Sequence, residues 1–533
     1  MKEFQQQINS SYPPILSLTP KDSGKGADIP IQIMDEQTYH LLETDKLFDA
    51  VNFTRTKTGS AILRRSLRQP LTDTQLITQK QRSLEELRSD DKLRGRIRDF
   101  IEEARKDEEF LYSHYRGDYS ASLIFVGNSI YNTYKGSSRL LTHLMTNLSP
   151  ENVTTPYLKV LLENFADLKK DAIADFIKGP VYTTFKGIRH FDDIGKFYPE
   201  PLLEFKATDW GVIRTAIMAG PLAGVFGMVL SGNPDLFAPA IMLELLYAVY
   251  PLYVRAYGRT FDNKLYVKPL ADMYFNNQNV LNAIESLGKL DELLSLADYA
   301  DYLQTPVTLP EISDSPYHFF EALDLRNPVL AKENPDYIGN DVNLGNGRLT
   351  FLTGPNSGGK TCLSRTILHC QLLAQIGSYI PASKAKIAIA DGIYYHSPMT
   401  NSLADDEGRF GVEIKRTAEI FFKTTPKSVV ILDELIEATT YEEKIKHSRD
   451  ILEGFYDLGS STILVTHNHE LAEYFKDKGQ GQFWQVEFKE QAATHKIIPG
   501  ISLDSHAEQV LMRMGFTKED IRRHVDYVQL TNG

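Results

Sequence analysis

The chain has 533 residues, more than one hydrophobic core usually organises, so two or three structural units are expected. Hydrophobic residues make up 42% and charged residues 24%, ordinary values for a globular protein that exclude a disordered, collagen-like or disulfide-stabilised chain. The 58 Lys and Arg against 70 Asp and Glu give a net charge of -12, which argues against binding nucleic acid by bulk charge but leaves a local basic face open.

The two cysteines and the first residues bear on the cellular compartment. Cys362 and Cys370 lie in one predicted helix, about 12 Å apart along its axis, so the pattern favours neither a mutual disulfide nor a metal-binding knuckle. Residues 1–14 are polar, without the apolar core of a secretory signal or the Arg-rich pattern of a transit peptide. A reducing, cytoplasmic location is therefore expected.

The first part of the chain is predicted to be helical after a flexible arm. Breaker residues and the lack of sustained periodicity predict the arm over residues 1–40. Over residues 41–205 the apolar spacing is that of packed helices, which predicts an all-α core or lever domain. Between Ala50 and Thr72 a basic run has no acidic member, which favours either a contact with a polyanion or, as the commoner case, a solvated helix face; its residues are Arg55, Lys57, Arg64, Arg65 and Arg68.

Residues 206–256 are predicted to form an apolar helical hairpin. Thr215–Ser231 contains no charged side chain, and Leu236–Val254 contains only Glu244. Both runs are near the lower length limit for crossing a membrane, so a membrane hairpin through residues 210–254 and a helical pair buried in protein remain equal alternatives. The first would put the protein at the inner face of the cell membrane. Helical periodicity resumes over residues 257–310, the predicted return of the lever.

Residues 311–515 alternate short β-type runs with helical patterns. Leu349–Thr353, Val429–Asp433 and Thr462–Thr466 are nearly continuous apolar or β-branched runs, as in a parallel sheet that is covered on both faces. These runs predict an α/β domain with a mostly parallel sheet, followed by a C-terminal helical tail over residues 516–533.

A complete phosphate-binding loop follows the first of these predicted strands and leads into a helix. Glycines allow backbone N–H groups to approach phosphate oxygens, the helix N-terminus favours negative charge, Lys360 reaches the β- and γ-phosphates, and the Thr361 hydroxyl ligates magnesium. The loop predicts ATP and Mg²⁺ as cofactors, and its residues are Gly354, Pro355, Asn356, Ser357, Gly358, Gly359, Lys360 and Thr361.

Two further predicted strands end in residues suited to hydrolysis. Asp433 follows a buried strand and is expected to hold magnesium, while Glu434 beside it is expected to polarise the attacking water. His467 follows the third strand and is expected to hydrogen-bond the γ-phosphate or that water. For His467 alone, a satisfied histidine at a strand end would be the simpler interpretation.

With these motifs the sequence resembles the MutS family, ATPases known for DNA mismatch repair and related to ABC-type ATPases. The resemblance is close over Thr353–Ala382 and continues at Asp433–Glu434, Thr466–Leu471 and Pro499–Ser502 with Ser505 and His506. Asn52–Pro70 looks like the family's helical core, and Leu325–Pro328 with Tyr337 looks like its adenine-side entry. The resemblance implies an ABC-like P-loop ATPase domain behind a helical lever domain, a homodimer formed through the ATPase domain, DNA as a partner, and Tyr337 stacked on the base.

Three departures limit the resemblance. Only about fifty residues precede the core, so the family's mismatch-recognition and connector domains are expected to be absent. Where the family carries Ser-Thr-Phe in the loop that reaches the partner's γ-phosphate, this chain has Gly408-Arg409-Phe410, and Arg409 is a candidate arginine finger acting in trans or else an exposed loop arginine. The segment after Glu434 also lacks the family's Gly-Arg-Gly run.

These features predict a protein of the MutS type that binds DNA and hydrolyses ATP. DNA repair is one candidate role for it. The alternative is a membrane-associated or protein-binding MutS-like ATP switch without mismatch recognition. An ABC transporter subunit is a weaker alternative, because the chain contains no Leu-Ser-Gly-Gly-Gln signature.

Overall fold

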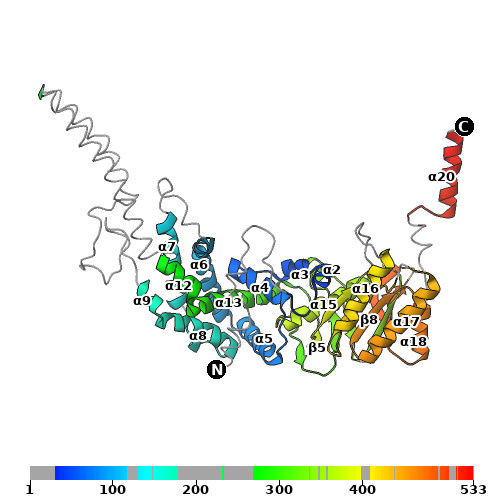
Figure 1. The fold of residues 1–533 in the computed structure, drawn as a ribbon, viewed down its shortest axis with the longest axis horizontal. Helices are drawn as coiled ribbons and strands as arrows, with labels where there is room; N and C mark the ends of the chain where they lie inside the picture. The colour runs from blue at the N-terminus through cyan, green and yellow to red at the C-terminus, as the bar shows by residue number, and fades with distance from the viewer. Residues whose placement is uncertain are drawn as a thin grey trace. The chain divides into compact units, whose positions relative to one another are not determined.

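A computed structural model of the chain describes most residues from Ile31 to Thr531 (Figure 1). The described ranges are 31–116, 129–146, 148–177, 231–232, 268–334, 336–345, 348–355, 358–397, 408–436, 439–489, 492–502, 512 and 514–531. The predicted arm lies outside them up to residue 30, and so does the predicted apolar hairpin except for residues 231–232. None of the helices in these ranges is both long enough and apolar enough to span a bilayer.

The structure divides into two compact units made of separated chain segments. Among the described residues, those of 54–62 and 86–294 form unit 1, and those of 31–53, 63–85 and 295–531 form unit 2. The domain boundaries expected from the sequence follow the chain continuously, whereas two short N-terminal segments belong to the same unit as the strands. Among the described residues every strand lies at or beyond Glu311.

The helices of the first three hundred residues account for the helical periodicity of the sequence. Long helices bury apolar stripes; in α13, for example, Leu287, Leu290 and Leu294 are fully buried. The described elements are α2 Glu36–Leu41, α3 Thr44–Val51, α4 Lys57–Arg68, α5 Thr74–Ser89, α6 Asp91–Arg116, α7 Ser129–Thr146, the 3-10 helix η2 Pro150–Asn152, α8 Pro156–Lys170, α9 Ala172–Phe176, α12 Lys268–Asn276 and α13 Gln278–Tyr302.

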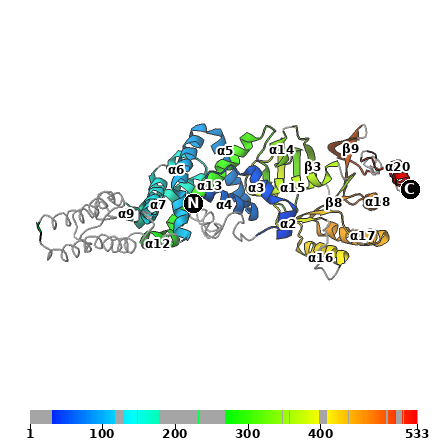
Figure 2. The same cartoon turned by 90° about the horizontal axis from the view of Figure 1, so that it is seen from above.

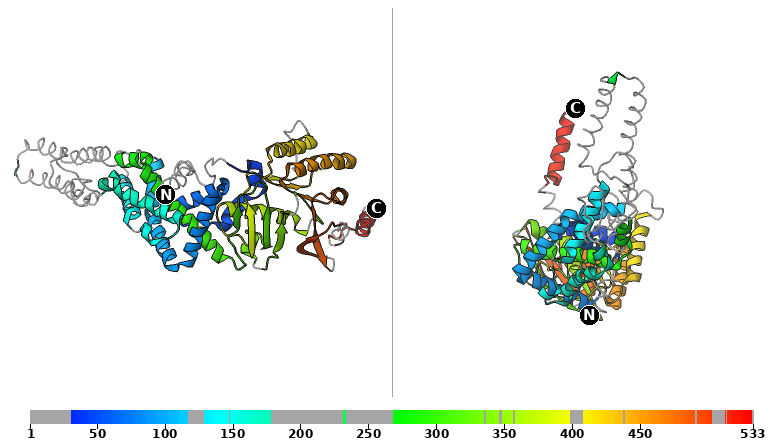
Figure 3. Two further views of the ribbon diagram at one scale, coloured as in Figure 1. Left: turned by 90° about the horizontal axis from the view of Figure 1, so that it is seen from below. Right: turned by 90° about the vertical axis from the view of Figure 1, so that its left-hand side faces the viewer.

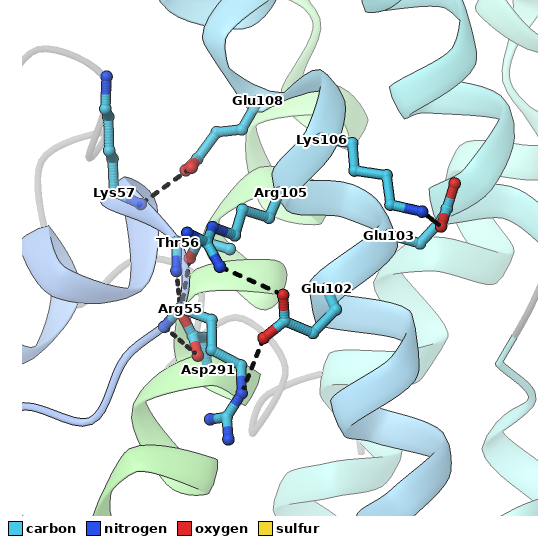
Figure 4. A network of polar contacts seen from close by, with 9 residues as sticks. All are labelled: Arg55, Thr56, Lys57, Glu102, Glu103, Arg105, Lys106, Glu108 and Asp291. Carbon is cyan, nitrogen blue, oxygen red and sulfur yellow. Dashed lines mark hydrogen bonds and ion pairs between the residues drawn. The ribbon is translucent and has the colours of Figure 1, made fainter.

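In unit 1 two carboxylates hold the backbone at the start of α4 (Figure 4). Asp291 on α13 accepts hydrogen bonds from the backbone N–H groups of Arg55 and Thr56, at 2.9 and 2.7 Å. Glu108 on α6 accepts from the N–H of Lys57 at 2.9 Å and from that of Thr58 at 2.7 Å. Because the first N–H groups of a helix lack partners within it, these side chains take the place of a local cap.

This arrangement requires a glycine at position 59. A Cβ built on Gly59 would lie 2.2 Å from Oδ2 of Asp291, closer than any real contact. The hydroxyls of Thr56 and Thr58 complete the network, because Thr56 Oγ1 donates to Asp291 at 2.7 Å and Thr58 Oγ1 donates to Glu108 at 2.5 Å. The Thr58-Gly59 pair of the sequence therefore serves a buried polar cap.

The larger sheet of unit 2 has six strands in the order β10-β9-β4-β8-β7-β6. β4 pairs in parallel with both β8 and β9, and β7 pairs in parallel with both β8 and β6, while β10 is antiparallel to β9. The strands are β4 Leu349–Thr353, β6 Ile393–His396, β7 Val429–Asp433, β8 Ser461–Thr466, β9 Gln482–Lys489 and β10 Ala492–Pro499. The expected α/β class, with mainly parallel pairing in this sheet, is what the structure has.

Helices cover the larger sheet, and alternation along the strands selects which side chains they meet. Phe351 and Leu464 belong to the core that packs against α16 (Gly408–Lys423), α17 (Tyr441–Leu458) and α18 (His469–Asp477). α16 and α17 lie side by side in Figures 2 and 3, with the rings of Phe421 and Phe455 5.0 Å apart. α15 (Lys360–Gln375) is almost wholly buried.

A smaller sheet has the order β1-β5-β2-β3, in which β1 is parallel to β5 and β2 is antiparallel to both of its neighbours. Its strands are β1 Glu311–Ser313, β2 Phe320–Leu325, β3 Asn340–Asn343 and β5 Lys384–Ala388. The remaining described helices are α14 Leu330–Glu333 and the C-terminal α20 Lys518–Thr531.

The segment over residues 31–53 is part of the fold of unit 2. The N–H of Ile393 at the start of β6 donates to the carbonyl of Ile33 at 2.7 Å, and the ring of His369 on α15 bonds the carbonyl of Leu42 at 2.6 Å. Lys332 donates to the carbonyl of Ala50 at 2.8 Å, near the end of α3. These contacts place α2 against β6 and α15, and the end of α3 beside α14.

Candidate nucleotide-binding site

The glycine-rich loop lies between β4 and α15, as the sequence predicts. Gly354 has a φ of 130° and Gly359 one of 88°, values that L side chains rarely adopt. Gly358 is needed for space, because a Cβ there would lie 2.7 Å from the side chain of Val486 on β9. Asn356 and Ser357 lie outside the described residues. A strand, a glycine-rich loop and a helix in this order are the geometry of P-loop proteins.

Lys360 folds back over this loop. Its Nζ donates to the carbonyls of Gly354 at 2.6 Å and Pro355 at 3.0 Å, and the residue is 2% exposed. Burial lowers the pKa of Lys360 to about 8, although the charges of Glu434 and Asp433 act in the opposite direction. Two neutral carbonyl oxygens hold a buried ammonium, so phosphate oxygens would be stronger partners for it.

Thr361 and Asp433 are brought together at the carboxyl end of the parallel strands. The Thr361 hydroxyl donates to Oδ2 of Asp433 at 3.1 Å. A hydroxyl and a carboxylate are ligand types that magnesium prefers, and protein sites often supply only one or two such groups, the rest coming from phosphates and water. Among the described residues no group of three or more His, Cys, Asp or Glu side chains forms a metal site. The pair therefore fits a magnesium ion that is bound together with a nucleotide.

Glu434 and His467 also lie together. Oε1 of Glu434 accepts the backbone N–H of His467 at 3.0 Å and lies 3.5 Å from its ring Nε2. Oε2 of Glu434 accepts the hydroxyl of Thr466 at 3.2 Å. The backbone of Glu434 is left-handed, with a φ of 56°, and its N–H donates to the carbonyl of Val465 at 2.9 Å. This turn directs the carboxylate across the end of β8.

Tyr337 lies beside the first turn of α15. Its hydroxyl is 3.2 Å from Sγ of Cys362, and the side chain is half-buried. Burial and the neighbouring Cys362 raise the pKa of Tyr337, so that the phenol stays protonated. The ring is thus next to the helix that follows the phosphate loop, and its stacking on a base stays a prediction.

Two residues near the loop were not identified from the sequence. Tyr395 on β6 donates its hydroxyl to Oδ2 of Asp433 at 3.1 Å. The ring of His495 on β10 comes within 3.4 Å of a Cβ built on Gly359, and the Asn340 amide holds the His495 carbonyl at 3.0 Å. Neither stands in a motif with recognisable spacing, and only the strand register brings them here.

The candidate trans-acting residue Arg409 lies in the first turn of α16. Its side chain and the preceding residues 398–407 lie outside what the structure describes, as do Glu437, Ser505 and His506. The arginine-finger interpretation accordingly stays a prediction.

The basic run of the sequence is largely engaged by carboxylates. Arg64 pairs with Asp45 at 2.7 Å, and Arg68 pairs with Glu36 at 2.6 Å. Arg65 is 1% exposed. The other two members pair with glutamates of α6, Arg55 with Glu102 and Lys57 with Glu109. These ion pairs do not support a polyanion contact, and they favour the alternative of a solvated helix face, on which Lys57 and the partners of Arg64 and Arg68 are exposed.

Family models match both parts of the chain. MutS domain III matches residues 31–297 and MutS domain V matches residues 350–526. MutS domain V is the ATPase domain of that family and has a P-loop fold. The domain III match alone covers half of the chain, and the chain belongs to the MutS family.

Curated relatives carry related names. The DNA mismatch repair protein MutS of Prochlorococcus marinus is 26% identical over 95% of this chain and 60% of its own length. For the DNA mismatch repair protein MutS of Thermotoga petrophila the identity is 25%, over 91% of this chain and 63% of the relative. The DNA mismatch repair protein msh3 of Aspergillus terreus is 25% identical over 86% of this chain and 45% of the relative. The chain spans about 60% of the length of the two bacterial relatives.

Proposed function

We propose that the protein binds ATP with Mg²⁺ at the loop between β4 and α15 and hydrolyses it. The observation that carries this proposal is the convergence of Lys360 and Thr361 at the start of α15 with Asp433 and Glu434 at the end of β7, with the Thr361 hydroxyl bonded to Asp433 at 3.1 Å. A buried ammonium, a helix N-terminus and an acidic pair are the groups that phosphoryl transfer to water needs.

Each residue has one proposed task. The loop N–H groups and Lys360 hold the phosphates, and Thr361 with Asp433 holds the magnesium, which when bound neutralises charge on the phosphate oxygens. Glu434 accepts a proton from the attacking water. His467, whose backbone N–H bonds Glu434 at 3.0 Å, orients that carboxylate. Tyr337 stacks on the base.

We further propose that the protein acts as a homodimer formed through its ATPase domain and that its nucleotide cycle drives lever movements on DNA, with DNA repair as the setting. Family membership and the names of the relatives support this proposal. No observation on the described residues favours the membrane-associated alternative, and the Prochlorococcus, Thermotoga and Aspergillus relatives are all named for DNA mismatch repair.

The decisive experiment measures ATP hydrolysis by the purified protein, with and without duplex, mismatched and branched DNA at a fixed salt concentration. Glu434→Ala should bind ATP with unchanged affinity, hydrolyse it at least about 100-fold more slowly and accumulate as a dimer with Mg²⁺ and ATP. Hydrolysis at the wild-type rate in that variant would refute the assignment of the base, and wild-type protein that binds no nucleotide would refute the proposed function.

Arg409 is proposed to supply positive charge to the partner's γ-phosphate. Arg409→Ala should lower turnover while ATP affinity stays the same, and mixing it with Glu434→Ala protein should restore part of the activity if the arginine acts across the dimer. Turnover equal to that of the wild type would remove Arg409 from the mechanism.

A further inference from the structure

Tyr395 places a buried hydroxyl beside Asp433, the candidate metal ligand. It belongs to none of the motifs found in the sequence. It lies on β6 and is fully buried. β6 pairs in parallel with β7, and Tyr395 is opposite Ile431, two residues before Asp433. The phenol reaches along β7 and donates to Oδ2 of Asp433 at 3.1 Å.

Asp433 therefore receives two hydroxyl donors on one carboxylate oxygen. Thr361 donates to the same Oδ2, also at 3.1 Å. Thr361 has its own proposed task as a magnesium ligand, whereas Tyr395 lies on the neighbouring strand β6 and has none. Hydrogen bonds from groups behind a metal-binding carboxylate fix its orientation, and both of these bonds leave Oδ1 to other partners.

The phenol is kept in its donor form. Burial raises the pKa of Tyr395, and the charge of Asp433 acts in the same direction. The charge of Arg365 on α15 acts in the opposite direction and lowers the pKa of Tyr395. The guanidinium carbon of Arg365 lies 6.0 Å from the centre of the Tyr395 ring, and Arg365 pairs with Glu43 at 3.4 Å.

The backbone of Tyr395 makes hydrogen bonds with two further residues, Thr38 and Arg416. Its N–H donates to Oγ1 of Thr38 at 3.3 Å, and Nη2 of Arg416 donates to its carbonyl at 3.5 Å and to the same Oγ1 at 3.1 Å. Arg416 is 7% exposed and makes two hydrogen bonds to Asp35, at 2.7 and 3.0 Å. A planar guanidinium that binds a carboxylate through two bonds is a rigid support.

We infer that Tyr395 is a positioning residue for Asp433: it holds the carboxylate in the orientation that receives the divalent cation, and Thr38 and Arg416 hold Tyr395 in turn. This inference rests on the proposed function of the site. It extends the cation site by one strand and connects it to the segment over residues 31–53.

The test measures binding of the cation itself. Mn²⁺ is titrated into full-length protein with a non-hydrolysable ATP analogue, and free Mn²⁺ is followed by electron paramagnetic resonance. Tyr395→Phe should raise the dissociation constant for Mn²⁺ about tenfold, the lower end of what loss of such a supporting group costs. Its affinity for the analogue without divalent cation should stay within about twofold of the wild type, because the Tyr395 hydroxyl bonds Asp433, which is not one of the proposed phosphate-binding groups.

Tyr394→Phe is the matched control. It removes the hydroxyl of the adjacent residue of β6. That hydroxyl donates to the carbonyl of Lys423 at 3.3 Å, and the Tyr394 ring faces the core on the other side of the sheet. Mn²⁺ affinity should equal that of the wild type in this variant. A purely structural effect of losing a β6 hydroxyl would instead weaken Mn²⁺ binding in both variants, and that result would overturn the inference.

Thr38→Val provides a second test if a low unfolding temperature shows that Tyr395→Phe is poorly folded. It removes the acceptor behind Tyr395 without touching Asp433 and should weaken Mn²⁺ binding about threefold. If Tyr395→Phe folds and its Mn²⁺ affinity is unchanged, the inference is overturned while the proposed function stands. If only Thr38→Val folds, unchanged Mn²⁺ affinity in that variant has the same meaning. Wild-type protein that binds the analogue neither alone nor with Mn²⁺ overturns both.

Discussion

Two regions of the molecule use carboxylates in opposite ways. In unit 1, Asp291 and Glu108 are occupied by backbone N–H groups at the start of α4 and by two threonine hydroxyls. In unit 2, Asp433 receives hydroxyl donors on one oxygen, and Lys360 bonds the weakly basic carbonyls of Gly354 and Pro355 in its own loop. The first arrangement satisfies the backbone of the fold, whereas the second leaves charge to be completed by a ligand.

The difference teaches that burial and charge alone do not identify a functional site. Asp291 is among the most buried acidic groups described, and burial raises its pKa to about 6, the kind of shift that often marks catalytic residues. Its partners, however, are main-chain N–H groups and the Thr56 hydroxyl of the same segment, and Gly59 packs directly on it. What the partners are, rather than how far the pKa moves, separates the two regions.

Lys360→Ala gives the largest expected effect on the unit 2 side of this comparison. Removing the ammonium takes away charge-assisted hydrogen bonds to phosphate, so ATP affinity should fall about 100-fold or more while the unfolding temperature changes little. Isothermal titration calorimetry with ATP and Mg²⁺ measures the ATP affinity. Lys384→Ala, at an exposed lysine of β5, is the control, and an affinity within threefold of the wild type for Lys360→Ala would contradict the phosphate assignment.

Glu108→Ala tests the unit 1 side. It leaves the N–H groups of Lys57 and Thr58 and the Thr58 hydroxyl without their acceptor, so the free energy of unfolding of unit 1 should fall by roughly 2–3 kcal/mol. Urea unfolding and faster hydrogen exchange of the amides over residues 55–62 measure it, with ATP affinity unchanged.

Lys57→Ala is the matched control for Glu108→Ala. It removes the exposed pair with Glu109 and the contact of the ammonium with the Tyr112 ring, and it keeps the backbone N–H that Glu108 accepts. The loss should stay below about 1 kcal/mol. Equal effects of the two substitutions would show that side-chain charge, not capping, explains the network.

The smallest expected effect is a pH dependence of unit 1. Since burial raises the pKa of Asp291 to about 6, against about 3.9 in an unfolded chain, the folded state holds this proton more tightly. Its stabilising contribution is complete below about pH 4 and is lost as the pH rises to about 6. The free energy of unfolding of the wild type should therefore fall over this range relative to Asp291→Asn. A difference between the two proteins that stays constant from pH 4 to 6.5 would contradict the shift.

The sequence predicts where the phosphate loop, Asp433 and Glu434 lie because each stands at the end of a buried strand, and parallel pairing brings the ends of such strands to one edge. Tyr395 and His495 escape this reasoning, because their roles depend on which strands are neighbours and on a register that no local pattern encodes. The basic run around α4 misleads for a related reason. Its acidic partners lie tens of residues away in the chain, so the run looks unpaired when it is read alone.

The contribution of residues 31–53 to unit 2 has a consequence for how the protein is synthesised and dissected. A fragment that begins near residue 311, where the strands start, would lack Asp35, Thr38 and Leu42, and would expose the buried Arg416 and the edge of β6 that Ile33 covers. During synthesis this segment leaves the ribosome well before β6 and α16, so it waits for those partners until they have been made. Sequence similarity to a C-terminal ATPase domain is thus a poor guide to where this protein can be cut.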